Sequence, residues 1–308
     1  MSAEENNLKI TNFSWQIDFL ERNVLEDDYL KKAARLFDPI LRAEKVNLAR
    51  LNKPLIIGIN GAQGSGKSTL ADYIKSYMCA EGHSAVSLSL DDFYLTREER
   101  FQLSRDTHPL LATRGVPGTH DIALAMNTLD RLSQKTGTVT IPRFDKSIDD
   151  RHSKEDWEIA QLPIQLILLE GWCLGAKPQP ADSLAIPVNE FEKNHDSNQA
   201  WREYVNKALA TNYQSLFQLV DKWVMLRAPS FDAVYRWRLH QEEKLIKKIL
   251  TQGKPLPPEI MQPNEIKRFI EHYQRITEST LIDLPKRVHY LYHLDEFREI
   301  TKHERPVP

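Results

Sequence analysis

The stretch that decides the fold spans residues 56–74 and reads IIGINGAQGSGKSTLADYI. The chain has eleven glycines, and four of them, Gly58, Gly61, Gly64 and Gly66, fall in this stretch. Glycine loses more conformational freedom on folding than any other residue, so this crowding calls for a physical reason. A short apolar run precedes the glycines and an amphipathic helical period follows them. We therefore expect a strand, a tight turn and a helix in direct succession.

The turn fits the pattern G-x-x-x-x-G-K-[ST] between Gly61 and Ser68. In such a turn successive backbone N–H groups converge on a polyphosphate, and side chains at the glycine positions would block that approach. The helix that follows adds the positive end of its dipole. We expect the Lys67 ammonium to contact the β and γ phosphates and the Ser68 hydroxyl to bind Mg²⁺. The predicted ATP-binding residues are Gly61, Ala62, Gln63, Gly64, Ser65, Gly66, Lys67, Ser68 and Thr69.

The composition is that of an ordinary globular protein. The chain has 308 residues, of which 41% are hydrophobic and 27% are charged. The formal net charge of −2 argues against a broad electrostatic grip on nucleic acid or on an anionic membrane. The chain has two cysteines, an acidic and polar start, and no apolar run as long as a bilayer span. We expect a cytoplasmic protein whose partner is a small-molecule substrate, and the oligomeric state is left open.

Strand-like and helix-like patterns alternate along the rest of the chain. Besides the run before the glycines, strand-like segments lie at 84–90, 137–144, 164–170, 222–227 and 287–294, and helical periods at about 120–134, 199–218, 231–250 and 264–279. This alternation predicts an α/β fold of the P-loop NTPase type, with a mostly parallel sheet flanked by helices. Residues 1–50 show leucines spaced among charges, which predicts a helical N-terminal extension packed on a domain over 51–308.

A phosphate loop alone does not name the activity, because G proteins, motors and small-molecule kinases all carry one. Guanine specificity normally needs an N/T-K-x-D motif. The pairs Asn52-Lys53 and Asn206-Lys207 are each followed by Leu at the place where Asp is required. The sequence therefore disfavours a GTP switch.

Acidic residues follow two of the predicted strands, at the edge where ligands bind in open α/β sheets. Asp91 and Asp92 come directly after residues 84–90, and a carboxylate there could orient an attacking hydroxyl in line with the γ phosphate. Glu170 ends another apolar strand and is well placed to hold Mg²⁺. The predicted catalytic residues are Lys67, Asp91 and Glu170. The alternatives are a turn or helix cap for the Asp pair and a solvated carboxylate for Glu170.

Five segments together carry a resemblance to a known family. They are G-A-Q-G-S-G-K-S (61–68), S-L-D-D-F-Y (89–94), R-G-V-P-G-T-H-D (114–121), I-P-R-F-D-K-S (141–147) and L-L-E-G-W-C-L-G (168–175). In order and spacing, from about residue 54 to about 303, the chain resembles the D-glycerate 3-kinase family. That family belongs to the P-loop kinases that include phosphoribulokinase, uridine kinase and bacterial pantothenate kinase. The resemblance implies transfer of a phosphoryl group from ATP to D-glycerate, giving 3-phosphoglycerate, with Asp91 as the catalytic acid and Glu170 as the metal-linked acid.

D-Glycerate carries one carboxylate, so its site needs a cation and donors or acceptors for two hydroxyls. Beside Asp91, the predicted substrate-binding residues are Arg114, Thr119, His120, Asp121, Arg143 and Lys146. An Arg fork pairs with a carboxylate in bidentate fashion, so we expect Arg114 or Arg143 to bind the substrate carboxylate. The alternative is that these are surface charges and a helix cap, with Thr119 or Asp121 capping the helix that follows.

A lid is expected around residues 227–250, with Arg236 and Arg238 as candidates to close over the transferred phosphoryl group. Residues two apart do not share a helix face, so one of the two arginines has another role, and Arg236 is the preferred candidate.

Two other functions stay open. One is a pantothenate- or uridine-type kinase, because R-G-V-P-G-T-H-D also resembles K-G-x-P-x-x-Y-D of the pantothenate kinases, although Phe144 stands where uridine kinases usually have Tyr. The other is a non-catalytic, nucleotide-dependent regulatory protein, which would have no need of Asp91.

Overall fold

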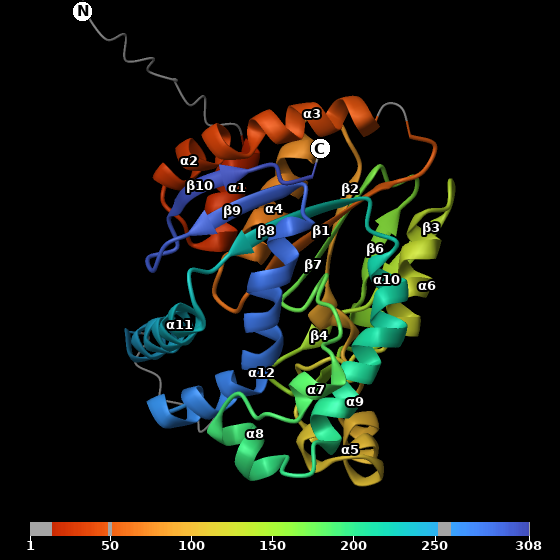
Figure 1. The fold of residues 1–308 in the computed structure, drawn as a ribbon. Coiled ribbons are helices and arrows are strands. Elements are labelled where there is room, and N and C mark those ends of the chain that lie inside the picture. Colours follow the sequence, from red (N-terminus) through yellow and green to blue (C-terminus); the bar gives the residue numbers. More distant parts are fainter. Residues whose placement is uncertain (1–13, 49–50, 252–259, 308) are drawn as a thin grey trace, which may run out of the picture.

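A six-stranded sheet forms the centre of the computed structural model, which describes residues 14–48, 51–251 and 260–307 (Figure 1). The strand order is β10-β9-β8-β1-β7-β2. The strands are β1 (Leu55–Gly61), β2 (Ala85–Ser89), β7 (Leu166–Gly171), β8 (Lys222–Arg227), β9 (Tyr290–Leu294) and β10 (Ile300–Glu304). All neighbouring strands run parallel except β9 and β10, which are antiparallel. The predicted mostly parallel sheet is confirmed.

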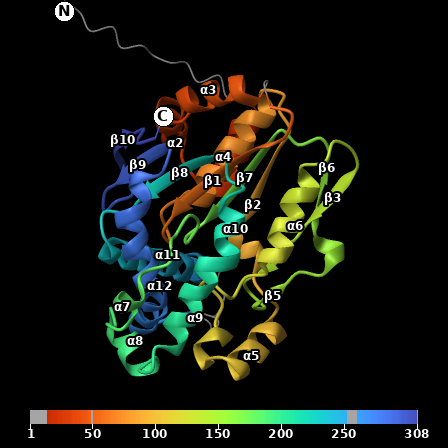
Figure 2. The ribbon, with the colours of Figure 1, turned by 45° about the vertical axis from the view of Figure 1, so that its right-hand side comes forward.

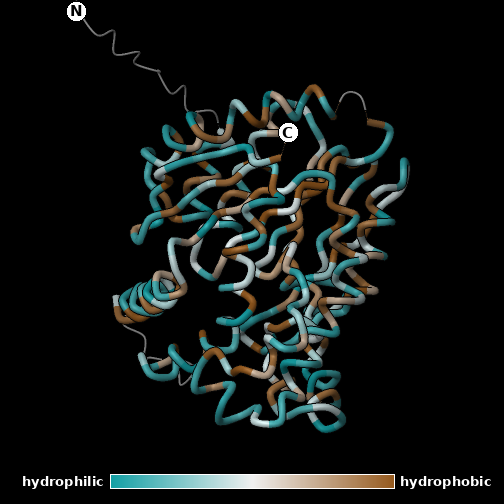
Figure 3. Tube along the Cα trace, in the orientation of Figure 1, coloured by the Kyte–Doolittle hydropathy of each residue, from teal (hydrophilic) through white to brown (hydrophobic). Residues whose placement is uncertain are grey.

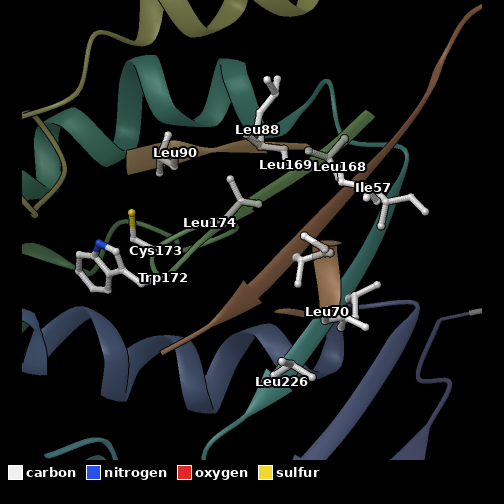
Figure 4. Packing of buried hydrophobic residues seen from close by; sticks show 14 of the residues in the cluster. Ile57, Leu70, Leu88, Leu90, Leu168, Leu169, Trp172, Cys173, Leu174 and Leu226 are labelled. Carbon is white, nitrogen blue, oxygen red and sulfur yellow. The ribbon is translucent and has the colours of Figure 1, made fainter. Parts of the chain in front are cut away.

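Burial on both faces explains why the inner strands read as continuous apolar runs. Every residue of β1 and β7 is buried, and the register of these strands places Ile57 beside Leu168 and Ile59 beside Glu170. Figure 4 shows Leu88 of β2 and Leu226 of β8 among the side chains that fill this core. Because β1, β2 and β7 run parallel, the segments that follow them meet at one edge of the sheet.

Helices cover the sheet and extend beyond its edge. The first helix after β1 is α4 (Lys67–Ala80), which packs on β1, β2 and β7. The other helices of the domain are α5 (Arg97–Asp106), α6 (Ile122–Leu132), α7 (Ala181–Leu184), α8 (Glu190–His195), α9 (Ala200–Ala208), α10 (Gln214–Phe217), α11 (Phe231–Thr251) and α12 (Pro263–Asp283). A π-helical turn (Leu209–Tyr213) joins α9 to α10, and short 3₁₀ turns span Leu90–Phe93, Pro109–Ala112, Lys154–Asp156 and Leu284–Lys286. In Figure 1, α11 stands out at the left of the molecule.

The predicted strand at 137–144 forms, but it lies outside the central sheet. Its core, β3 (Thr138–Ile141), pairs antiparallel with β6 (Glu158–Gln161), beside α6 (Figure 2). Residues of β3 alternate between exposed and buried, as in a strand with one solvated face, whereas β1 and β7 are buried throughout. The chain then forms a second small ribbon from β4 (Phe144–Asp145) and β5 (Asp150–Arg151).

The N-terminal segment is helical over its described part, as the sequence predicts. It forms α1 (Ser14–Asn23), α2 (Asp28–Leu36) and α3 (Asp38–Leu48), which lie beside α4, β9 and β10 at the top of Figure 1. Phe19 and Leu41 are buried in the same core cluster as the strands. The division into an extension over 1–50 and a domain over 51–308 stays a prediction, although the two parts share one core.

Hydropathy along the chain follows this arrangement, with apolar residues gathered in the strands and polar residues along the outer helices (Figure 3). The predicted loop at 175–199 contains the two short helices α7 and α8. The predicted loop at 251–264 lies largely outside the described residues. Within the part of the chain that the structure describes, no helix is long and apolar enough to cross a membrane.

Candidate active site

The glycine-rich loop after β1 has the backbone that its sequence requires. Gly64 and Gly66 have positive φ angles of 78° and 91°, a region that side chains disfavour. α4 begins immediately afterwards at Lys67, and the first amides of a helix have no acceptor within it. No atom lies within 4 Å of the position that a Cβ on Gly66 would occupy, so this side of the loop is open. The loop therefore forms an anion cradle at a helix N-terminus.

Lys67, Ser68 and Glu170 come together at this cradle. The Ser68 hydroxyl donates to Glu170 Oε1 at 2.8 Å, and Lys67 Nζ lies 3.7 Å from Glu170 Oε2. The parallel register of β1 and β7 positions the acid, because it places Glu170 beside the end of the strand that enters the loop. Glu170 is only 5% exposed, and its Oε2 has no hydrogen-bond partner in the described part of the chain. A buried carboxylate and a hydroxyl are oxygen donors of the kind that Mg²⁺ prefers.

Asp91 lies on the neighbouring strand end, in the 3₁₀ turn that follows β2. Its Oδ2 accepts from Lys146 Nζ at 2.6 Å, and its Oδ1 accepts from the Tyr94 hydroxyl at 3.1 Å. Burial alone would raise the pKa of Asp91, but the positive charges of Lys146 and then Lys67 outweigh it and lower the pKa to about 2. Asp91 is therefore ionised near neutral pH and acts as a hydrogen-bond acceptor.

Asp92 has a different role from its neighbour. It closes a capping box with Ser89, whose backbone N–H donates to Asp92 Oδ2 at 3.1 Å. The same oxygen accepts from Arg143 at 2.8 Å. The sequence left open whether the Asp pair caps a turn or faces the substrate. In the structure Asp92 caps the turn, while Asp91 faces Lys146.

Two predicted substrate-binding residues of the segment 114–121 form local hydrogen bonds that stabilise the loop and the helix after it. Thr119 is fully buried, and its hydroxyl donates to Val116 O at 2.7 Å and accepts from the Gly115 N–H at 3.1 Å. Asp121 accepts from the Leu124 N–H at 2.9 Å and so caps α6, as the capping alternative predicts for this residue. The Thr119 hydroxyl and the Asp121 carboxylate are therefore already engaged in hydrogen bonds within the protein.

His120 lies deeper in the same segment, stacked on the ring of Tyr94 with centroids 4.3 Å apart. Its Nδ1 lies 2.5 Å from the Tyr213 hydroxyl, which also accepts from the Gly118 N–H at 3.0 Å. Burial lowers the pKa of His120 to about 4, although the Asp91 charge acts in the opposite direction. His120 is therefore a neutral imidazole near pH 7 rather than a cation.

The two candidate arginines differ in how they are held. Arg143 is bound on one side by Asp92 and on the other by Glu158, so its fork is already occupied by two carboxylates. Arg114 pairs with Asp149, which also pairs with the buried Arg100, and the Arg114 guanidinium lies 5.5 Å from the centroid of the Phe144 ring.

Arg114 also lines an open cavity of about 760 Å³. The other lining residues include Arg97, Phe101, Asp149, Asp150 and Phe269. Arg114 therefore has access to a space in which a small acid could bind.

The predicted lid region is the long helix α11, and its two arginines point to different partners. Arg236 pairs with Glu296 at 2.8 Å and is about half exposed. Arg238 pairs with Glu242 at 2.7 Å and lies over the Phe269 ring, which belongs to the cavity beside Arg114. The two arginines have different ion-pair partners, as expected for residues on different faces of one helix.

Several residues of this site were missed by sequence reasoning. Tyr94 stands within the quoted S-L-D-D-F-Y segment, so its position next to Asp91 was a signal that could have been used. Tyr213 and Asp149 come from distant segments without a motif, and only the fold brings them to His120 and Arg114.

Comparison with known proteins places the chain among kinases, although no protein-family model matches it. It is 34% identical over 277 residues to the uncharacterized kinase mug58 of Schizosaccharomyces pombe, covering 85% of this chain and 96% of that protein. It is 34% identical over 198 residues to the chloroplastic D-glycerate 3-kinase of Arabidopsis thaliana, covering 61% of this chain and 41% of that protein. Among solved structures, the D-glycerate 3-kinase of Cryptococcus neoformans matches with a TM-score of 0.70 and 25% identity, over 87% of this chain and 98% of that one.

Proposed function

This chain belongs to the D-glycerate 3-kinase family of P-loop kinases, and we propose that it transfers the γ-phosphoryl group of ATP to a hydroxyl of D-glycerate to give 3-phosphoglycerate. One observation carries this proposal. The anion cradle, the ionised Asp91 and the buried Glu170 meet at the same edge of the sheet, on three strands that run parallel. A non-catalytic nucleotide-binding protein has no use for that combination.

Asp91 is proposed to accept the hydrogen bond of the attacking hydroxyl and to hold it in line with the γ phosphate. A carboxylate with a pKa of about 2 is too weakly basic to remove the proton early in the reaction. Phosphoryl transfer passes through a loose transition state in most analyses, so positioning the nucleophile contributes more than deprotonating it. The low pKa therefore suits an orienting role.

Ser68 and Glu170 are proposed to hold Mg²⁺, either directly or through water. The Glu170 carboxylate supports this assignment, because its buried Oε2 accepts no hydrogen bond within the described residues and has the Lys67 ammonium 3.7 Å away as its ion-pair partner. A buried carboxylate oxygen that accepts no hydrogen bond is costly, and a bound cation would offset that cost. A Mg²⁺ ion held by these two residues would supply positive charge that offsets the negative charge developing on the transferred phosphoryl group. Lys67 would contribute its point charge to the β and γ phosphates.

Arg114 is the proposed partner of the substrate carboxylate. Lys146, which donates a hydrogen bond to Asp91, is proposed to lie on the same side of the substrate. Arg143 is a weaker candidate, because two carboxylates of the protein already occupy its fork.

His120 is proposed to contribute as a neutral hydrogen-bonding group, while Thr119 and Asp121 shape the loop. Arg238 or Arg236 would approach the phosphoryl group if α11 acts as a lid.

The deciding experiment is a coupled ADP-release assay with Mg-ATP and one acceptor at a time. D-Glycerate, pantothenate and uridine are compared with a reaction that lacks an acceptor, and the Asp91→Asn variant controls for contaminating kinases. Turnover with D-glycerate alone is the expected result. Turnover with pantothenate or uridine alone would show that D-glycerate is not the acceptor. Absence of ADP release with every acceptor would favour a regulatory protein.

A further inference from the structure

Arg114 meets a carboxylate of the protein at the place where it is proposed to bind the carboxylate of the acceptor. Asp149 pairs with the Arg114 guanidinium, and both residues line the open cavity of about 760 Å³. The side chain of Asp149 is 39% exposed and that of Arg114 is 27% exposed, so the pair is accessible from the cavity. An acid that enters this cavity therefore finds Arg114 already occupied.

A second arginine holds Asp149 from the interior of the protein. Arg100 of α5 is fully buried, and its Nη2 lies 2.9 Å from Asp149 Oδ2. Its Nη1 donates to Asp149 Oδ1 at 3.1 Å, and its Nη2 donates to the backbone carbonyl of Asp149 at 2.7 Å. Removing one partner of a buried ion pair leaves an uncompensated charge, which is strongly destabilising. Arg100 therefore keeps a firm hold on Asp149 that does not involve Arg114.

The charges of these three groups do not balance. Two guanidinium groups share one carboxylate, and within the described residues neither Arg100 nor Arg114 forms an ion pair with another acidic side chain. The two guanidinium groups lie 5.7 and 5.5 Å from the centroid of the Phe144 ring, which attracts cations but carries no net charge. The group of three thus has one positive charge in excess, and a second carboxylate would neutralise it.

The backbone at Asp149 is held independently of its carboxylate. Asp149 lies in the turn between β4 and β5, beside α5 (Figure 2), with a positive φ angle of 56°. Asn and Asp adopt this left-handed region more readily than other residues with a side chain. Lys146 lies in the same turn and donates to Asp91. Because Arg100 also binds the Asp149 carbonyl, the turn stays anchored when the carboxylate changes its partner.

We propose that Asp149 occupies, in the empty enzyme, the place of the acceptor's carboxylate on Arg114, and that it thereby selects for acidic acceptors. An acid takes over the Arg114 fork while Asp149 stays paired with Arg100, so each guanidinium then has its own carboxylate. A neutral acceptor cannot replace the charge of Asp149 and leaves the pair closed. The inference rests on the proposed function, in which Arg114 binds the acceptor's carboxylate. Asp149 itself lies outside the five motifs that carry the family resemblance.

Asp149→Asn tests the proposal by removing only the competing charge. Asn keeps the size of the side chain, keeps one accepting oxygen and tolerates the positive φ angle. Charge-assisted hydrogen bonds are roughly twice as strong as neutral ones, so Arg114 should be easier to capture. Calorimetric titration should show the dissociation constant of D-glycerate falling roughly threefold or more. That of D-glyceramide, the neutral analogue, should not change, and thermal melts check folding.

Two controls separate this competition from a general effect of charge. Asp150→Asn removes a neighbouring negative charge that lines the same cavity, and within the described residues Asp150 forms no ion pair with Arg114. It should change the dissociation constant of D-glycerate less than Asp149→Asn does. In an Arg114→Ala background, Asp149→Asn should have no further effect on D-glycerate binding, because the site of competition is gone. Equal falls in the two Asn variants, weaker D-glycerate binding by Asp149→Asn, or an effect that persists without Arg114 would overturn the proposal.

The ADP-release assay keeps a failure of this inference distinct from a failure of the proposed function. If the native protein phosphorylates D-glycerate and the Asn variants contradict the competition, only the role of Asp149 is wrong. If the native protein phosphorylates another acid, the proposed acceptor is wrong, and the same titrations are made with that acid and its amide. Turnover with an uncharged acceptor alone would overturn the selection for acids as well.

Discussion

The nucleotide side and the acceptor side of the sheet edge are built from different kinds of group. On the nucleotide side, one continuous loop leads into α4, whose first residues Lys67 and Ser68 meet Glu170 of β7. On the acceptor side, charged side chains from separate segments are held in pairs, such as Asp91 with Lys146 and Arg114 with Asp149. The first kind of site is encoded mostly within one short motif, with Glu170 added by a neighbouring strand. The second depends on the whole fold.

This difference changes what a substitution should do on each side. A backbone cradle loses little when a neighbouring side chain is changed, whereas a paired charge leaves its partner behind in a partly buried place. Substitutions on the acceptor side should therefore separate residues that bind substrate from residues that only hold a neighbour.

The largest effect is expected at the junction of the two sides. Asp91→Asn should lower kcat by roughly 100-fold or more, because the attacking hydroxyl loses its charged acceptor while the phosphate cradle is untouched. ATP affinity, measured by titration, should stay nearly constant. Lys67→Ala is the contrasting variant, which should weaken both turnover and ATP binding. An Asp91→Asn enzyme with normal turnover would remove Asp91 from the reaction.

A smaller effect should distinguish the two arginines. Arg114→Ala should raise KM for D-glycerate by roughly 10- to 100-fold, the usual size of a lost charge-assisted hydrogen bond, with little change in KM for ATP. Arg143→Ala should mainly lower the melting temperature, because Asp92 and Glu158 lose their shared partner. Steady-state kinetics and thermal melts of both variants decide between them. The reverse pattern would assign the carboxylate to Arg143.

The pH dependence should show how Lys146 controls Asp91. In the native protein Asp91 stays ionised down to a pKa of about 2 and loses its charge only as pH falls through that value. Lys146→Met removes the strongest opposing charge, so burial should raise the pKa of Asp91 and move the acid limb of kcat/KM to higher pH. Lys135→Met, an exposed lysine elsewhere, is the control. Identical acid limbs in the variant and the native enzyme would contradict this coupling.

The smallest effect is expected from the hydroxyl of Tyr94. Tyr94→Phe removes one hydrogen bond to Asp91 and keeps the ring that stacks on His120, so kcat should fall only about fivefold. Tyr204→Phe removes a hydroxyl that bonds to Gly118 O at 3.4 Å and serves as the control. A loss as large as that of Asp91→Asn would show that Tyr94 does more than orient the carboxylate.

The sequence predicted the parts of the fold whose information is local. The phosphate loop, α4 and the apolar strands follow from spacing over a few residues, and the structure has them where the patterns place them. The central sheet lacks 138–141, because a strand pattern does not say which partner the strand will find.

The site was predicted less completely than the fold, for the same physical reason. Glu170 and Asp91 were found because parallel strands bring their ends to one edge. The charge pairs were not found, since Arg143 meets Asp92 and Arg114 meets Asp149 across large distances in sequence. The sequence also did not reveal a cavity of about 560 Å³ beside the phosphate loop, because its walls include residues from segments 25–37 and 294–300, which lie near opposite ends of the chain.

The two cysteines have a practical consequence for anyone labelling this protein. Cys173 is fully buried, and burial raises the pKa of its thiol, so it forms little of the reactive thiolate. Cys79 is exposed on α4, at the end of the helix opposite the phosphate loop. A maleimide dye should therefore attach at Cys79 alone in the folded protein. That single fluorophore would report on the helix whose first turn grips the phosphates, without any engineered substitution.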